Sequence, residues 1–420
     1  MTRLHFLYAI FASVVLLPWI TVSPSAPEIR PEWLLLIVSL LVFHRIKAQA
    51  IDSVVVFWSA AVGISFAISL VYGAALLKVV VDLSDLFELL KPILYLLLYV
   101  FVASTCLSML QLRRFLHFAL LVLSGVGVLS IVQFFSPEVV SPILTLYTDT
   151  ERISQYVQSR ATGTMGNANT LGMLFVFGYA LSLFTYRHRL FDTLTASAIV
   201  LIMLLGLLAS GSRTAFVCLL LVTLCYLLWE AKLRLKSVLV VGMIAVALFK
   251  VGDSNLDLVR GSIQRYATLM NVARDAGWKG RVHGAMETLS EIKQAALLGH
   301  GPDKMGFETG TNIDNEYILI LYRYGAIGLL VLGGFFYSLW RQSQIQQETS
   351  VPLVRSYAHF ATAVLLASLV FAYTAGMYQV FRLMMLLIIF LTVGAYARVD
   401  SSDWEDRILF ETAAAPREGF

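Results

Sequence analysis

Residues 53–72 read SVVVFWSAAVGISFAISLVY, a run of twenty residues that contains no charged side chain. An α-helix rises about 1.5 Å per residue, so a run of about twenty apolar residues crosses the ~30 Å hydrocarbon core of a bilayer. Blocks of comparable length recur along the whole chain. The stretch therefore predicts one membrane-spanning helix among many.

The composition supports this reading. Of the 420 residues, 58% are hydrophobic and 14% are charged, and the mean hydropathy is +0.77. Soluble domains are nearer half apolar and about a quarter charged. The net charge of +4 is small, so it gives no support for a nucleic-acid partner. In a membrane protein it mostly reflects basic loops on the cytoplasmic side.

We expect an all-α membrane protein with about twelve transmembrane helices. The apolar blocks lie near residues 6–21, 32–43, 53–72, 91–110, 115–135, 169–185, 191–209, 214–229, 237–251, 317–340, 354–373 and 377–397.

Lysine and arginine residues occupy alternate connections between these blocks, and their distribution predicts the orientation. With twelve spans, all of them fall on the same side as Arg3, so both termini are expected to be cytoplasmic. The residues concerned are Arg45, Lys47, Arg113, Arg114, Arg187, Arg189, Lys232, Arg234, Lys236, Arg341, Arg355 and Arg398.

The pattern divides the chain into four parts. Residues 1–251 are expected to hold nine helices with an outer loop at 136–168, and residues 252–316 to form a large, partly helical outer loop. Residues 317–397 hold the last three helices, and residues 398–420 form a polar cytoplasmic tail.

The large outer loop contains a helical pattern, which predicts an amphipathic helix from about Val282 to Leu298. Gly299, Gly301 and Pro302 then end it. We therefore expect a helical cap on the outer face. The apolar residues at helical spacing are Met286, Leu289, Ile292 and Ala296.

A first polar cluster, RATGTMGNAN at residues 160–169, immediately precedes an apolar block. Its glycines allow unusual backbone angles, and the amides of Asn167 and Asn169 are suited to sugar hydroxyls. The alternative is a helix-initiating loop in which Asn167 is the cap.

A second cluster, ASGSRTA at residues 209–215, joins two apolar blocks with almost no turn between them. Arg213 is therefore expected at or just below the membrane surface. A charge at that depth is a functional candidate. The alternative is an interfacial arginine that reaches the lipid headgroups.

The large outer loop also carries Arg260, Arg265, Arg274 and Lys279, nearly balanced by acidic residues, which is typical of a solvated face. Arg281 differs because it opens the predicted helix. There its side chain and the free N–H groups of the first turn could together hold an anion.

A third cluster, TNIDNEY at residues 311–317, begins the tenth block. Asp314 or Glu316 could act as a general base if partial burial raises its pKa. The alternative is that Asp314 caps the helix and Glu316 complements its dipole. Arg323 lies two turns further in and is expected to need a partner.

Neither a zinc-ligand spacing, a P-loop, a nucleophile elbow nor an Asp-x-Asp pair occurs in the sequence, so we expect neither metal nor cofactor. The cysteines Cys106, Cys218 and Cys225 fall in apolar segments and are expected to be packing residues. Only His283 and His300 among the histidines are expected on the outer side.

Taken in order, these clusters resemble the bacterial O-antigen ligase / O-antigen polymerase superfamily. The resemblance covers most of the chain, from about Arg160 onward by motif and throughout by topology, with a large outer loop before the third-last span. The matching residues are Gly163–Asn169, Ser210–Arg213, Gly280-Arg281, Gly299–Gly301, Asp314–Tyr317 and Tyr324–Gly328.

The resemblance implies a metal-independent, inverting glycosyltransferase with a GT-C-like helical bundle in the bacterial inner membrane. Its donor would be an undecaprenyl-diphosphate-linked glycan at the periplasmic face, and a chain-length regulator is a candidate partner. Arg213 and Arg281 would hold the diphosphate, and Arg160 and Arg265 would add to that cradle. The remaining expected substrate-binding residues are Asn167, Asn169, Asn315, Glu316 and Tyr317.

One departure bears on the choice within the superfamily. Many ligases carry His-Asn where this chain has Asp314-Asn315, and that histidine is the family's expected base for the acceptor hydroxyl. Asp314 would replace it here, unless His283 or His300 substitutes in space. The departure favours a polymerase of O-antigen or exopolysaccharide repeats over a ligase that transfers glycan to lipid A–core.

A transporter or flippase is the alternative from another class. It would need polar residues and helix breaks near mid-membrane in matching halves of the chain. The sequence has no such internal repeat, and its polar residues gather at one face.

Overall fold

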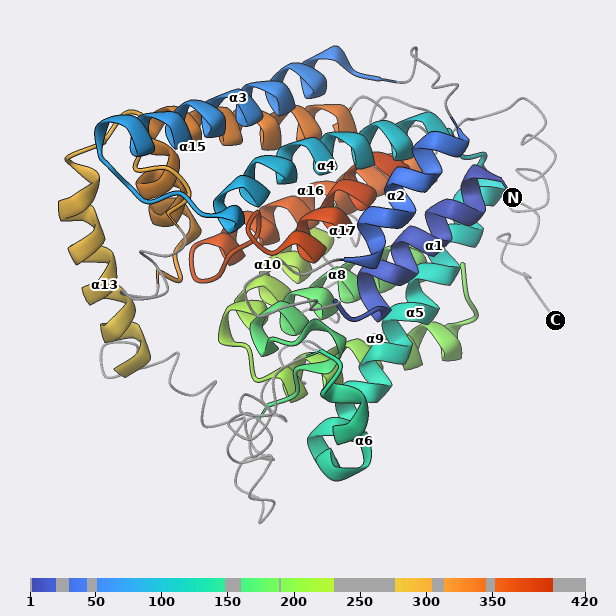
Figure 1. Ribbon diagram of the computed structural model, residues 1–420. Coiled ribbons are helices and arrows are strands. Elements are labelled where there is room, and N and C mark those ends of the chain that lie inside the picture. Colours follow the sequence, from blue (N-terminus) through green and yellow to red (C-terminus); the bar gives the residue numbers. More distant parts are fainter. Residues whose placement is uncertain are drawn as a thin grey trace, which may run out of the picture.

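The computed structural model describes residues 2–19, 30–43, 51–147, 160–188, 190–229, 276–303, 313–344 and 352–395. Within these ranges all regular structure is helical, with thirteen α-helices and one short 3-10 helix, η2. Figure 1 shows the arrangement. The elements are α1 (Arg3–Leu16), α2 (Pro31–Val42), α3 (Ser53–Leu76), α4 (Leu83–Thr105), α5 (Met109–Phe135), α6 (Pro137–Leu144), η2 (Gly163–Met165), α8 (Ala168–Arg187), α9 (Thr193–Ser210), α10 (Arg213–Trp229), α13 (Ala276–Ile292), α15 (Glu316–Gln344), α16 (Pro352–Ala372) and α17 (Phe381–Val393).

Seven of these helices are long and apolar enough to cross a membrane, namely α3, α4, α5, α8, α9, α15 and α16. Four more, α1, α2, α10 and α17, are apolar but shorter. The protein is therefore a multi-pass helical membrane protein, as the composition predicted. The expected ninth block, at residues 237–251, lies outside the described residues, so the number of twelve spans stays a prediction.

Helix α17 forms the centre of the bundle. Every residue from Phe381 to Val393 is buried, and α17 packs against α1, α4, α15 and α16. A helix that is apolar all round belongs in the interior of a bundle. Its single charged residue, Arg382, is 2% exposed.

The boundary between α4 and α5 lies earlier than expected. Residues 91–110 and 115–135 were predicted to be separate helices divided by Arg113 and Arg114, but α4 ends at Thr105 and α5 begins at Met109. Ser108 causes the break, because its side chain accepts a hydrogen bond from the Gln111 N–H in a capping box. Cys106 ends α4 in the left-handed conformation, with φ 44°.

The outer loop contains a helix, as predicted, but the predicted bounds of that helix are wrong. It runs from Ala276 to Ile292, six residues earlier at both ends than the predicted 282–298. The predicted apolar face is correct only in part, because Ile292 is buried but Met286 is 65% exposed and Thr288 is buried in its place. The helix stops early because backbone groups of residues 296–301 form hydrogen bonds with α15 instead.

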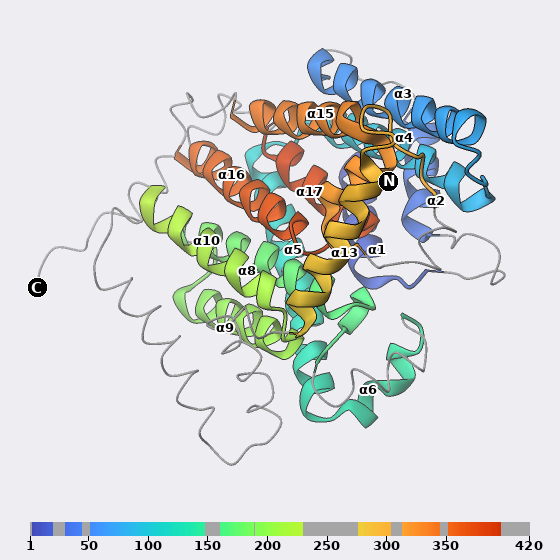
Figure 2. The ribbon, with the colours of Figure 1, turned by 90° about the vertical axis from the view of Figure 1, so that its left-hand side faces the viewer.

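Helix α13 lies at the end of the bundle away from the N-terminus and is steeply inclined to α3 and α15 (Figure 1). Turning the molecule by 90° places it in front of the bundle end, running from α15 toward the region of α8 and α10 (Figure 2). It therefore crosses the bundle end rather than continuing a span.

Helix α15 is broken at Gly325, where the backbone leaves helical geometry with φ 65° and ψ −171°. The N–H groups of Ala326 and Ile327 instead donate to the carbonyls of Ala296 and Leu297, at 2.8 and 3.2 Å. Backbone groups inside a membrane protein must be satisfied internally. The residues after α13 meet that requirement for the break in α15.

The same segment also donates hydrogen bonds to the carbonyls that precede the break in α15. The N–H groups of His300 and Gly301 donate to the carbonyls of Tyr322 and Arg323, at 2.9 and 2.8 Å. Gly299 must be glycine, because φ is +74° and a Cβ there would lie 2.4 Å from the Arg323 carbonyl carbon. The motifs Gly299–Gly301 and Tyr324–Gly328 are thus held together by backbone hydrogen bonds between α15 and the segment after α13, an arrangement we call the interlock.

Replacing Gly299 by alanine tests this interlock. We expect Gly299→Ala to cost about 2–4 kcal/mol of stability, because it adds left-handed strain and a backbone clash. Thermal unfolding of the purified protein in detergent should show a lower midpoint. Gly125→Ala is the matched control, since a Cβ at Gly125 meets nothing within 4 Å. Equal midpoints for the two variants would contradict the interlock.

Candidate active site

The loop that precedes α8 is held by buried polar contacts from α5. The Gln133 side-chain carbonyl accepts from the N–H groups of Thr162 and Gly163, at 3.1 and 2.9 Å. Gly166 has φ +67°, and a Cβ there would lie 2.4 Å from the Tyr147 carbonyl oxygen. These contacts hold residues 163–166 (GTMG) in a single backbone conformation.

Arg160 connects the first two polar clusters. Its Nε donates to the carbonyl of Ser210 at 2.9 Å, and one terminal nitrogen donates to Oδ1 of Asn169 at 2.7 Å. Arg213 begins α10 three residues after Ser210, with Gly211 between them at φ +58°. Segments separated by fifty residues are thereby joined at one end of the bundle.

The neighbouring asparagine has the capping role. Oδ1 of Asn167 accepts from the N–H groups of Asn169 and Thr170, at 2.8 and 3.3 Å, so Asn167 is the N-cap of α8. This confirms the alternative reading of Asn167 as a cap. The cap leaves the Asn167 side chain exposed.

Close helix packing brings α8 to the start of α10. A Cβ at Gly172 would lie 2.7 Å from Cβ of Ser212 and 2.8 Å from Cβ of Ala215. Only a residue without a side chain permits this approach. Gly172 thus sets the distance between the first cluster and Arg213.

The third cluster begins α15, and Asn315 is its cap. Oδ1 of Asn315 accepts from the Ile318 N–H at 3.2 Å, so the alternative in which Asp314 caps this helix is wrong. Asp314 is the half-buried residue just before that cap. The hydroxyl of Tyr317 donates to the Leu369 carbonyl at 2.7 Å, which ties α15 to α16.

Glu316 is buried, and its carboxylate is held by the turn between α16 and α17. It accepts from the N–H groups of Met377 at 2.7 Å and Gln379 at 2.8 Å. The nearby Lys91 donates to the Gln379 side chain at 3.0 Å and lies 2.8 Å from the carboxylate of Glu88. The start of α15 is therefore anchored to this turn.

The same turn contacts the second cluster. The hydroxyls of Thr374 and Thr214 are hydrogen-bonded, and Thr214 directly follows Arg213. The segment 373–380, which we call the inter-helix turn, thus lies beside the start of α10 and binds Glu316.

Arg382, in the first turn of α17 directly after the inter-helix turn, adds further connections. It donates to the carbonyl of Thr164 at 2.7 Å and to the carbonyl of Leu17, and its guanidinium lies 5.3 Å from the Trp19 ring centroid. Its Nε is 4.0 Å from the fully buried carboxylate of Glu32. Burial raises the pKa of the neighbouring Tyr147 phenol, whose hydroxyl donates to the Leu16 carbonyl.

Sequence reasoning missed the residues of this network, which are Glu32, Glu88, Lys91, Gln133, Thr374, Gln379 and Arg382. For Glu32, Lys91, Gln133, Gln379 and Arg382, the available signal was a charged or amide side chain within an otherwise apolar block. Such residues within membrane helices are costly and mark functional or structural sites.

Two of the expected phosphate ligands cannot be placed. Arg265 lies outside the described residues, and only the backbone of Arg281 is described, within α13. Because α13 begins at Ala276, Arg281 is not in its first turn. The expectation that Arg281 shares the free N–H groups of a helix start is therefore wrong.

The two outer histidines have different surroundings. His300 is buried and stacks on Tyr322, with ring centroids 4.5 Å apart. His283 lies on the exposed side of α13, where its ring is 3.2 Å from the carboxylate of Glu287. Within the described ranges no three His, Cys, Asp or Glu side chains gather as metal ligands would.

The order of these elements along the chain can be compared with known families. Residues 198–333 match the O-antigen ligase family. The match covers about a third of the 420 residues, from α9 into α15, and includes Arg213, Arg281 and Asp314. It supports the resemblance to the O-antigen ligase / polymerase superfamily that the motifs indicate. A search of curated proteins finds no match for this chain.

The buried pair formed by Glu32 and Arg382 gives a prediction for the stability of the protein. We expect Arg382→Met to cost about 3–5 kcal/mol, because it leaves the Glu32 carboxylate buried without its cation. The double variant Glu32→Gln, Arg382→Met should recover part of that loss. Chemical unfolding in mixed micelles measures both. Strictly additive effects of the two substitutions would show that the pair does not interact.

Proposed function

We propose that this protein is an inverting glycosyltransferase that polymerises undecaprenyl-diphosphate-linked repeat units at the periplasmic face of the bacterial inner membrane. The observation that carries the proposal is the meeting of three polar clusters at one bundle end. Arg160 joins Asn169 to Ser210, and the inter-helix turn joins Thr214 to Glu316. Arg213 lies between these two connections in the chain.

The distribution of positive charge supports the orientation. Arg341 lies 3.9 Å from Asp52, and Arg3 donates to the Ser104 carbonyl at 2.6 Å, both at helix ends opposite to Glu316. An excess of arginine and lysine is typical of the cytoplasmic side. The end that carries Arg213 and Asp314 then faces the periplasm.

In the proposed reaction, a sugar hydroxyl of the acceptor attacks the anomeric carbon of the donor. Asp314 accepts the hydroxyl proton, a new carbon–oxygen bond forms, and the bond from the anomeric carbon to the diphosphate oxygen breaks. The electron pair leaves with undecaprenyl diphosphate. The guanidinium groups of Arg213 and Arg281, with Arg160 and Arg265 beside them, stabilise that charge without a metal ion.

The other residues of the clusters bind and position. Asn167, Asn169 and Asn315 offer amide groups to sugar hydroxyls, and Tyr317, two residues after Asn315, is a further substrate-binding residue. Glu316 acts through the inter-helix turn, because its carboxylate oxygens accept from Met377 and Gln379.

A ligase that transfers finished glycan to lipid A–core is the second candidate, favoured by the description of the matching family as O-antigen ligase. The two activities differ in the acceptor. A deletion strain that accumulates lipid A–core with a single repeat has lost a polymerase. Free undecaprenyl-linked polymer beside unmodified core indicates a lost ligase.

Arg213 tests the site itself. We expect Arg213→Ala to abolish glycan assembly in the deletion strain, because the leaving diphosphate loses a fixed positive charge worth about 10²–10³-fold in rate. Gel analysis of the cell's glycans measures this. Arg341→Ala, at the opposite end of the bundle and about half exposed, is the matched control and should assemble normally. An Arg213→Ala protein that inserts normally and keeps full assembly would refute the site.

Substitutions of Asp314 test its proposed role as the general base. Asp314→Asn should lower the transfer rate by about 10²–10⁴-fold while donor binding stays unchanged, because only proton acceptance is removed. Asp314→His should restore a large part of the rate, since imidazole can accept the same proton. Initial rates with extracted lipid-linked donor measure both variants. Full activity of Asp314→Asn would assign the base elsewhere.

A further inference from the structure

Lys91 is a nearly buried cation in a helix that is long and apolar enough to cross a membrane. Its side chain is 15% exposed, and its ammonium lies 2.8 Å from the carboxylate of Glu88, which is fully buried. Both residues belong to α4, one of the candidate spans. Replacing such a pair by apolar side chains is often neutral or stabilising, so stability alone does not account for an ion pair at this depth.

Side chains of α4 hold the carbonyl groups of the inter-helix turn. The ammonium of Lys91 donates to the backbone carbonyl of Gln379 at 3.3 Å and to its side-chain carbonyl at 3.0 Å. The hydroxyl of Tyr95 donates to the backbone carbonyl of Tyr378 at 2.9 Å. Residues four apart lie on one face of a helix, so Lys91 and Tyr95 bind the turn together.

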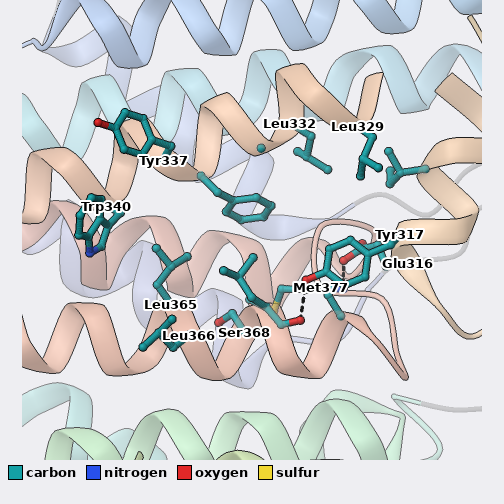
Figure 3. A pocket seen from close by; sticks show the side chains of 15 residues that line it. Glu316, Tyr317, Leu329, Leu332, Tyr337, Trp340, Leu365, Leu366, Ser368 and Met377 are labelled. Carbon is teal, nitrogen blue, oxygen red and sulfur yellow. Dashed lines mark hydrogen bonds between the residues drawn. The ribbon is translucent and has the colours of Figure 1, made fainter. Parts of the chain in front are cut away.

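The N–H groups of the same part of the turn are held by α15. The carboxylate of Glu316 accepts from Met377 and Gln379, and Figure 3 shows Glu316 near Met377 at one end of the apolar pocket between α15 and α16. Gln379 is therefore bound at both of its backbone groups, by a carboxylate from one span and an ammonium from another. Side chains of α4 and α15 thus fix the backbone of residues 377–379.

The other end of the inter-helix turn reaches the residue beside Arg213. Thr374 lies five residues before Gln379, so their Cα atoms are at most about 18 Å apart. The hydroxyl of Thr374 is hydrogen-bonded to that of Thr214, and Arg213 and Thr214 are the first two residues of α10. A displacement of the turn at Gln379 is therefore transmitted to the contact next to Arg213.

We propose that Lys91 is a positioning residue, which places Arg213 for the donor diphosphate through the inter-helix turn. The inference rests on the proposed function of Arg213 and adds a residue of α4 to that site. A misplacement of about 1 Å can cost about 10²-fold in rate. Additional negative charge develops on the diphosphate only as its bond to the sugar breaks, so a displaced Arg213 should lower kcat while KM stays nearly constant.

Two variants separate positioning from stability. Lys91→Met keeps the length of the side chain and removes its charge and its donors, but it also leaves the buried Glu88 carboxylate without this cation, which is destabilising. The double variant Glu88→Gln, Lys91→Met removes both charges and should recover most of the lost stability. It does not restore the hydrogen bonds to Gln379, so its transfer rate should stay low.

Tyr357→Phe is the matched control for the loss of a buried hydrogen bond. Tyr357 is 2% exposed, and its hydroxyl donates to the Phe390 carbonyl at 2.8 Å, which joins α16 to α17. Along α16 it lies roughly 22 Å from Ala372, where the helix ends beside the inter-helix turn. We expect Tyr357→Phe to lower the thermal unfolding midpoint without changing kcat.

The experiment uses the full-length proteins in phosphatidylglycerol nanodiscs, with extracted lipid-linked repeat units as the substrate. Initial rates give kcat and KM, and thermal unfolding in detergent gives the midpoint. We expect kcat to fall about 10–10²-fold in Lys91→Met and in the double variant, with KM within about twofold of the wild type. Amide hydrogen exchange, measured by mass spectrometry, should rise in both variants over residues 373–380 and 211–217, and should not change there in Tyr357→Phe.

Three results would overturn the positioning role. One is a kcat that follows the unfolding midpoint across the three variants, which would make the role of Lys91 structural. The second is a change in KM alone, which would place Lys91 on the substrate-binding surface. The third is unchanged hydrogen exchange over residues 211–217 in Lys91→Met, because no displacement would then reach α10. The proposed function fails separately, through normal glycan assembly by Arg213→Ala, and hydrogen exchange reports the coupling of Lys91 to α10 in either case.

Discussion

The bundle end depends on one buried carboxylate. Glu316 is 3% exposed and accepts from two backbone N–H groups of the inter-helix turn. A buried charge is costly unless hydrogen-bonded, so the turn and the start of α15 stabilise each other. Because the same turn contacts Thr214 and, through Arg382, Thr164, this anchor also determines where the other two clusters lie. Loss of the carboxylate would therefore release three connections together.

The break in α15 is the second constraint. Gly325 leaves helical geometry, and the carbonyls of Ala296 and Leu297 take over the hydrogen bonds that the helix loses. This exchange fixes the segment after α13 against a membrane helix. Helix α13 carries Arg281 and crosses the bundle end (Figure 2). The interlock thus connects the position of the outer helix to the fold of the spans.

Local patterns predicted the membrane helices because apolar length is a property of contiguous residues, as in 53–72. The same patterns singled out Arg160, Asn169 and Arg213, since polar residues beside glycines interrupt apolar blocks. They missed Arg382 and Lys91, whose partners lie 218 and 288 residues away in the chain. Pairing over such separations leaves no periodic trace in the sequence. The face of α13 was misjudged for a related reason, because tertiary contacts with α15 decide which of its residues are buried.

The two arginines anchored at this end differ in their electrostatic surroundings. Two hydrogen bonds donated by Arg160 go to the neutral oxygens of Ser210 and Asn169, whereas Arg382 lies 4.0 Å from the carboxylate of Glu32. Neutral acceptors orient a guanidinium without cancelling its charge. In surroundings of low dielectric constant, an oriented charge acts more strongly on an anion than it would in water. A guanidinium oriented in this way before a ligand arrives meets the condition that the proposed reaction sets, namely stabilisation of a diphosphate leaving group by side chains that are already in place.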